Sequence, residues 1–118
     1  MSLNDIIERF TLVSGWDMQE VSRYLPVIRD CAAYFEDRIG RELTDGERGR
    51  AAYACAVYAY YKIASVCRDG GLSFKAGDVQ VNMDEICESA RRMWESERRE
   101  IADIVDIGGD FAFRSVKV

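Results

Sequence analysis

The stretch that decides the fold runs Ala51-Ala-Tyr-Ala-Cys-Ala-Val-Tyr-Ala-Tyr-Tyr61 and carries no charge over eleven residues. A surface helix shows polar side chains on every turn, so this run predicts a helix that is covered on nearly all sides. Its alanines allow neighbouring helices to approach closely, and its tyrosines fill the gaps while their hydroxyls need partners. Full coverage by one small domain is demanding, so we expect a core helix that another subunit could cover in part.

The signals that begin and end this helix are also clear. Thr44 and Glu47 form a capping box, and the acidic residues of this first turn suit the positive end of the helix dipole. Gly70-Gly71 predicts the end. The central helix is therefore expected to be the longest element of the chain.

Two helical segments precede it. Residues 3–13 carry apolar side chains at the spacing of a one-sided helix, with Ser2 as its cap, Ser14-Gly15 at its end and Trp16 as an anchor to the rest. Residues 18–39 form the second segment. Pro26 interrupts it, so we expect a short helix to Tyr24, a restart at Pro26 and an end at Gly40. The apolar stripe of the second part consists of Ile28, Cys31, Ala32, Phe35 and Ile39.

The C-terminal third predicts one more helix between two extended segments. Residues 73–81 read as a short hairpin or an extended loop because Val79-Gln80-Val81 alternates and Gly77-Asp78 is a turn signal. A capping box of Asn82 and Glu85 opens a charged helix over residues 83–105. Residues 111–118 alternate in the manner of a strand. The fold expected is thus mainly all-α: a single domain over residues 1–118, with about four helices, a loop or hairpin between the last two long helices, and an extended C-terminal tail.

Composition restricts the function. The formal charge of −5 argues against a general nucleic-acid-binding surface, because such surfaces neutralise phosphates with basic side chains. No stretch approaches the roughly 20 apolar residues that span a bilayer, and the first ten residues mix charges with apolar residues, unlike a signal peptide. We therefore expect a cytoplasmic protein.

The residues needed for catalysis are sparse. The chain has no histidine, so the usual general base and the usual triad are missing. The four cysteines form no CxxC pair and are expected to be buried, reduced thiols; Cys67 beside Arg68 is the one candidate nucleophile. The carboxylates sit at helix starts or on charged faces. We expect no enzyme, no metal site and no cofactor.

Three features remain without a catalytic role: the central helix, the loop of residues 73–81, and the tail. The loop is either a plain connector or a contact surface, since Phe74, Val79 and Val81 give it apolar content that a connector does not need. The tail either packs on its own domain or docks on a neighbour, because two phenylalanines are unfavourable in water. Together these features favour an interaction module.

Four segments carry a likeness to a known family: Tyr34-Phe-Glu-Asp-Arg-Ile-Gly40, Tyr58-Ala-Tyr-Tyr61, Ser73-Phe-Lys-Ala-Gly-Asp-Val79 and Phe111-Ala-Phe-Arg114. In these segments the chain resembles the head–tail connector (head-completion or adaptor) proteins of tailed bacteriophages and prophages. It spans most of the chain, from about residue 25 to residue 114. The first 23 residues match less clearly.

The resemblance implies a structural protein of the virion neck, present in the host bacterial cytoplasm during assembly. Such proteins are helical bundles that form rings, dock beneath the portal protein, extend the DNA channel and receive the next neck or tail protein. DNA would be passing cargo, and no membrane is involved. The residues implied for subunit or portal contacts are Ser73, Phe74, Lys75, Asp78, Val79, Val81, Phe111, Phe113 and Arg114. The alternative, from the residues alone, is a small helical regulatory module that binds another protein without catalytic activity.

Overall fold

The computed structural model describes residues 2–68 and 83–105, and these residues form five helices and no strand. The helices are α1 (Leu3–Ser14), α2 (Met18–Arg23), α3 (Leu25–Arg38), α4 (Asp45–Arg68) and α5 (Met83–Glu100). The predicted all-α bundle is confirmed. The loop of residues 73–81, the Gly70-Gly71 stop and the tail of residues 111–118 lie outside the described residues.

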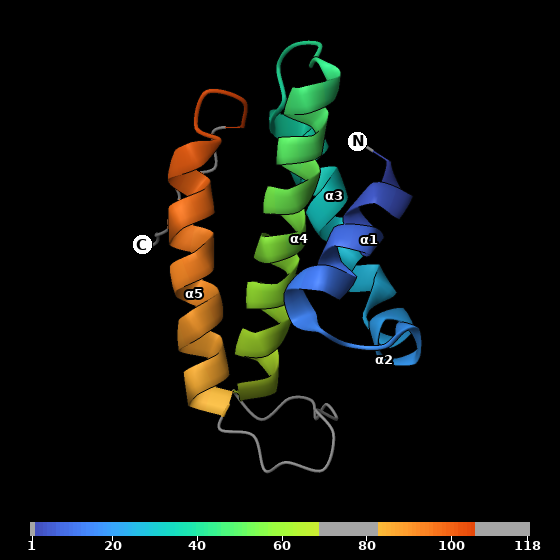
Figure 1. Cartoon of the computed structure of the whole chain (residues 1–118), viewed down its shortest axis with the longest axis vertical. Helices are drawn as coiled ribbons and strands as arrows, with labels where there is room; N and C mark the ends of the chain where they lie inside the picture. Colours follow the sequence, from blue (N-terminus) through green and yellow to red (C-terminus); the bar gives the residue numbers. More distant parts are fainter. Residues whose placement is uncertain (1, 69–82, 106–118) are drawn as a thin grey trace.

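The central position of α4 organises the bundle. It packs against α1, α3 and α5, and Figure 1 shows α5 along one side of it and α1 along the other. The alanines of residues 51–61 are all buried, as are Cys55 and Val57. The neighbours within the chain therefore cover this helix, and only Tyr53, at 37% exposure, is left outside among its large apolar side chains of residues 51–61.

The tyrosines of α4 fill the gaps on two different sides. Tyr60 lies within 6.2 Å of Phe10 and 5.9 Å of Trp16, ring centre to ring centre. Tyr58 lies 4.7 Å from Trp94 and stacks on Tyr34 at 5.7 Å. Since residues two apart on a helix point in very different directions, each tyrosine joins a separate set of neighbouring elements. These ring contacts stabilise the packing beyond the area that they bury.

The ends of the first helices follow their sequence signals. The Ser2 hydroxyl accepts a hydrogen bond from the Asp5 amide at 3.3 Å, and Gly15 ends α1 in the left-handed conformation with φ 75°. Trp16 is buried against Phe10, as expected of an anchor. The second segment divides at Tyr24 into α2 and α3, with Pro26 in the first turn of α3. With this division the described residues form five helices.

The capping box of α4 is present in full. The Glu47 amide donates to the Thr44 hydroxyl at 3.2 Å, and the Thr44 amide donates to the Glu47 carboxylate at 3.0 Å. Arg41 adds a bidentate ion pair to the same carboxylate. This pairing with Arg41, followed by the backbone hydrogen bond at Thr44, lowers the pKa of Glu47 to about 2.

The predicted extent of the last helix was wrong at its C-terminal end. Instead of continuing to residue 105, α5 ends at Glu100, and residues 101–105 form a turn. In this turn the amides of Ile104 and Val105 both donate to the Ile101 carbonyl at 2.8 Å. Folding back buries the side chains of Ile101, Ile104 and Val105.

Candidate functional site

The contact residues implied by the family resemblance are not placed by the structure. All nine lie outside the described residues: Ser73, Phe74, Lys75, Asp78, Val79, Val81, Phe111, Phe113 and Arg114. The same holds for Asn82 of the second capping box. The described residues instead offer two hollows on the surface, one polar and one apolar, which sequence reasoning did not find.

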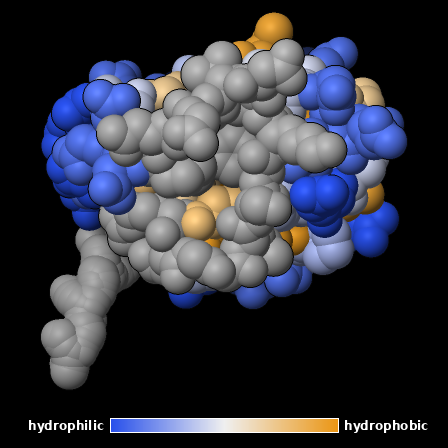
Figure 2. All heavy atoms as spheres, turned by 90° about the horizontal axis from the view of Figure 1, so that it is seen from below, coloured by the Kyte–Doolittle hydropathy of each residue, from blue (hydrophilic) through white to orange (hydrophobic). Residues whose placement is uncertain are grey.

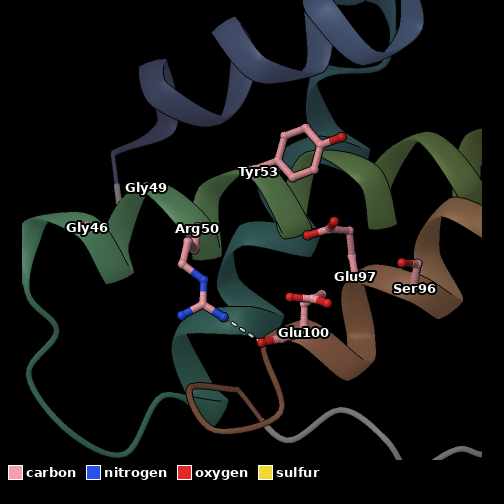
Figure 3. A pocket seen from close by; sticks show the side chains of 7 residues that line it. All are labelled: Gly46, Gly49, Arg50, Tyr53, Ser96, Glu97 and Glu100. Atoms are coloured by element: carbon pink, nitrogen blue, oxygen red, sulfur yellow. Dashed lines mark hydrogen bonds between the residues drawn. The ribbon is translucent and has the colours of Figure 1, made fainter.

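The polar hollow lies between α4 and α5 and has a volume of about 590 Å³ (Figure 3). Its α4 wall uses positions spaced by three and four residues, which share one face of a helix. Two of these positions are glycines, so no side chain extends from them into the hollow. A methyl group added at Gly46 would meet nothing within 4 Å. The residues that line the polar hollow are Gly46, Gly49, Arg50, Tyr53, Ser96, Glu97 and Glu100.

Two charged side chains of the polar hollow, Arg50 and Glu97, differ in the contacts that stabilise their charges. The Arg50 guanidinium donates to the backbone carbonyl of Glu100 at 2.5 Å and lies 3.9 Å from the Asp103 carboxylate. It thereby satisfies a carbonyl at the C-terminal end of α5, where a cation also suits the helix dipole. Partial burial, followed by repulsion from Glu100, raises the pKa of Glu97, and Arg50 opposes this shift.

The polar hollow presents side chains that can accept hydrogen bonds. Figure 3 shows side chains of both helices around it, among them the Tyr53 phenol and the carboxylates of Glu97 and Glu100. Such groups accept hydrogen bonds from a cationic or amide group. Within residues 2–68 and 83–105, no three metal-ligating side chains lie close enough together to hold an ion.

The apolar hollow lies on the outer face of α1 and reaches the first residue of α2. Leu12, at 82% exposure, and Met18, at 55%, are the two most exposed large apolar side chains of the described residues. The Thr11 hydroxyl donates to the Ile7 carbonyl at 2.9 Å, so this polar atom is already satisfied inside the helix. The apolar hollow has a volume of about 490 Å³ and is lined by Asn4, Ile7, Glu8, Thr11, Leu12 and Met18.

A third area of surface is the end of the bundle where α4 finishes and α5 begins. Figure 2 shows that hydrophilic residues gather on the two flanks of this end, with small areas of hydrophobic surface between them. Val66, in the last turn of α4, is 48% exposed.

The cysteines behave as the sequence predicted. All four are free and buried. Burial raises the pKa of Cys31 to about 12 and also raises that of Cys55. Burial likewise raises the pKa of Cys67, whose sulfur lies 3.8 Å from the Tyr24 hydroxyl. The thiolate needed for nucleophilic attack is therefore disfavoured at the position that the sequence had singled out.

Ion pairs lie along the surface of α5. Arg91 and Arg92 pair with Glu88, and Arg98 pairs with Glu95 at 2.9 Å. Each pair joins residues three or four positions apart on the helix. No helix of the described residues is long and apolar enough to cross a membrane.

Comparisons with family models, with curated proteins and with solved structures find no significant match for this chain. The resemblance to phage connectors therefore depends on the sequence segments quoted for it.

Proposed function

We propose that this chain is a structural subunit of a bacteriophage or prophage neck. Copies of it assemble into a ring that docks on the portal protein, surrounds the DNA channel and joins the head to the next neck or tail protein. It works in the virion neck and is made in the cytoplasm of the host. Its activity is assembly, and it carries out no chemical reaction.

The observation that best supports an assembly role is the exposure of Leu12 and Met18 beside an apolar hollow. Folding does not explain these side chains, because α1 buries its opposite face, with Ile6 and Phe10 fully inside. Apolar side chains grouped on a surface mark a place where another molecule binds. The step from assembly to a phage neck is supported by the segments around Tyr34, Tyr58, Ser73 and Phe111.

The acidic balance of the chain is compatible with this role. A surface that lines or surrounds a DNA channel must let the phosphates pass, whereas a basic surface would retain them. With a formal charge of −5, the chain would lack the net positive field that holds DNA.

The test is reconstitution with the portal protein encoded in the same genome. The purified chain is mixed with assembled portal rings, and the product is examined by sedimentation and by electron microscopy. We expect an added layer on one end of the portal ring. A chain that stays monomeric at all concentrations and leaves portal rings bare would contradict the proposal. A genome in which no portal, capsid or tail gene accompanies this one would also count against it.

The apolar hollow also favours a second candidate function. A regulatory module that sequesters a host protein needs a persistent apolar groove on the isolated monomer, and the hollow beside Leu12 has that character. Stoichiometry separates the two functions. The regulatory module forms a 1:1 complex with its target and no larger assembly, whereas the neck protein associates with further copies of itself.

A further inference from the structure

We propose that the polar hollow between α4 and α5 binds the guanidinium group of an arginine side chain from a partner protein. The inference goes beyond the proposed function, because such a site requires neither a ring nor a portal protein. Three features of the hollow support it: the open space between the helices, a half-buried carboxylate that makes no hydrogen bond, and an aromatic ring that lines the same space.

The space between α4 and α5 is large enough to admit a side chain of another molecule. Its volume of about 590 Å³ lies within the range of sites that bind small ligands. On the α4 wall, a methyl group added at Gly46 would meet nothing within 4 Å. At Gly49 the atom nearest to such a group belongs to the Arg9 guanidinium, which donates to the Asp5 carbonyl within α1. Arg9 does not line the hollow, so the space stays open.

The Glu97 carboxylate is the group in the hollow that a cation would stabilise most. Its side chain is half-buried, and among the residues that the structure describes it makes no hydrogen bond and no ion pair. Partial burial and the neighbouring Glu100 disfavour its charged form and raise its pKa. A positive group bound in the hollow would offset both effects.

Arg50 lines the hollow, but its own contacts hold its charge elsewhere. Its guanidinium donates to the Glu100 backbone carbonyl at 2.5 Å and lies 3.9 Å from the Asp103 carboxylate. Figure 3 shows this guanidinium turned toward the backbone of Glu100. One positive charge thus stands beside the carboxylates of Glu97, Glu100 and Asp103, and the hollow keeps a net negative charge.

The Tyr53 ring favours a guanidinium over other cations. The residue is 37% exposed, and within the described part of the chain its ring stacks on no other ring and its hydroxyl makes no hydrogen bond. A guanidinium is planar, so its face can lie on an aromatic ring while the N–H groups at its edge donate to carboxylates. Glu97 and Glu100 can accept these bonds together, because residues three apart share one face of α5.

The shape of the hollow favours a side chain of a protein over a free small cation. Ser96 and Glu100 are exposed, so the hollow is open toward solvent and can enclose only the end of a longer molecule. The rest of a protein partner can add contacts at this open side. The formal charge of −5 also attracts basic protein surfaces and speeds their approach.

The experiment titrates the full chain, labelled with ¹⁵N, with blocked peptides in which glycines flank a central arginine, lysine or citrulline. Citrulline is neutral and nearly identical to arginine in shape. We expect the arginine peptide to shift the amide signals of Tyr53, Ser96 and Glu97, with half-saturation at about 1 mM. The lysine peptide should bind a few-fold more weakly, and the citrulline peptide should give no saturable shift.

Substitutions in the hollow test the two groups that contact the guanidinium. Glu97→Gln removes the charge with little change of shape and should weaken binding of the arginine peptide at least about tenfold. Tyr53→Leu removes the ring and should weaken binding about two- to fivefold, whereas Tyr53→Phe keeps the ring and should weaken it less.

A matched control separates the site from the overall charge of the chain. Asp30→Asn removes one negative charge from an exposed position of α3, a helix that contributes no residue to the hollow. This variant should bind the arginine peptide as the unchanged chain does. Thermal unfolding of each variant shows that it is folded at the temperature of the titration.

Several results would overturn the inference. The site does not exist if the arginine peptide gives no saturable shift up to about 20 mM, or if Glu97→Gln binds it unchanged. Equal binding of the lysine peptide would mean that the hollow does not select a guanidinium. If free spermidine binds more tightly than the arginine peptide, the occupant is a small cation and not a partner protein. None of these results depends on ring formation, which the reconstitution with portal rings tests separately.

Discussion

Helices α1 and α4 pack against each other, yet they differ in how much of their apolar surface the rest of the chain buries. Along residues 51–61 of α4, neighbours within the same chain bury every alanine. On α1, Phe10 is fully buried, but Leu12 stays 82% exposed only two residues later. Helix α4, which the sequence suggested as a partial subunit contact, is thus covered mainly by other helices of the same chain. The exposed face of α1 is where apolar surface is left for a partner.

The largest expected loss of stability comes from a substitution on the buried face of α1. Phe10→Ala removes a fully buried ring that lies 5.5 Å from Trp16 and 6.2 Å from Tyr60. Because the surrounding side chains cannot close the cavity completely, the free energy of unfolding should fall by about 3–5 kcal/mol. Urea denaturation followed by circular dichroism measures this loss.

Leu12→Ala is the matched control for that loss, since it truncates a large apolar side chain on the same helix. Its effect on the free energy of unfolding should stay within about 0.5 kcal/mol. Similar losses for the two variants would mean that the outer face of α1 is covered within the folded chain, and the comparison between the two helices would no longer hold.

A smaller loss of stability is expected when a larger side chain replaces a buried alanine of α4. Ala56 is fully buried, so Ala56→Leu forces extra atoms between packed helices and should lower the free energy of unfolding by about 1–3 kcal/mol. Tyr53→Leu changes an exposed position of the same helix and should have little effect. Equal stability of Ala56→Leu and the unchanged chain would show that the helices are not in close contact at the alanines.

The burial of α4 and the position of its first turn could be predicted from the sequence, because local patterns indicate both. The uncharged run of residues 51–61 indicated a buried helix, and Thr44 with Glu47 indicated its start. The end of α5 was missed because the burial of Ile104 and Val105 depends on how the chain folds back onto the core. A helical pattern alone carries no information on that packing.

The hollows were harder to predict than the helices. The one available signal for the apolar hollow was Leu12, which lies off the stripe of Leu3, Ile6, Ile7 and Phe10 at the helical period. The polar hollow had no signal, because it joins residues of α4 and α5 that are about 50 positions apart, as the Arg50 to Glu100 hydrogen bond shows. The segments implied by the resemblance remain predictions.

The smallest expected effect concerns the polar hollow, where the coverage of α4 is incomplete. Partial burial and Glu100 raise the pKa of Glu97 above its ordinary value of 4.5. The folded state therefore binds the proton more tightly than the unfolded state. The contribution of Glu97 to stability is therefore fully present at pH values below its ordinary pKa of 4.5. This contribution is lost as the pH rises through the raised pKa of the folded state. Glu97→Gln removes this loss.

We expect Glu97→Gln to be slightly more stable than the unchanged chain at pH 7, with the difference shrinking toward pH 4. Thermal unfolding over this pH range measures it. Asp37→Asn provides the control, because it removes one negative charge from an exposed position of α3 and corrects for the change in net charge. If Glu97→Gln destabilises the chain at pH 7, the Glu97 carboxylate must be held by favourable contacts in the folded state. In that case the charged side chains of the polar hollow would stabilise the folded state, as the buried side chains around α4 do. The polar hollow would then no longer differ from the rest of the surroundings of α4 in its contribution to stability.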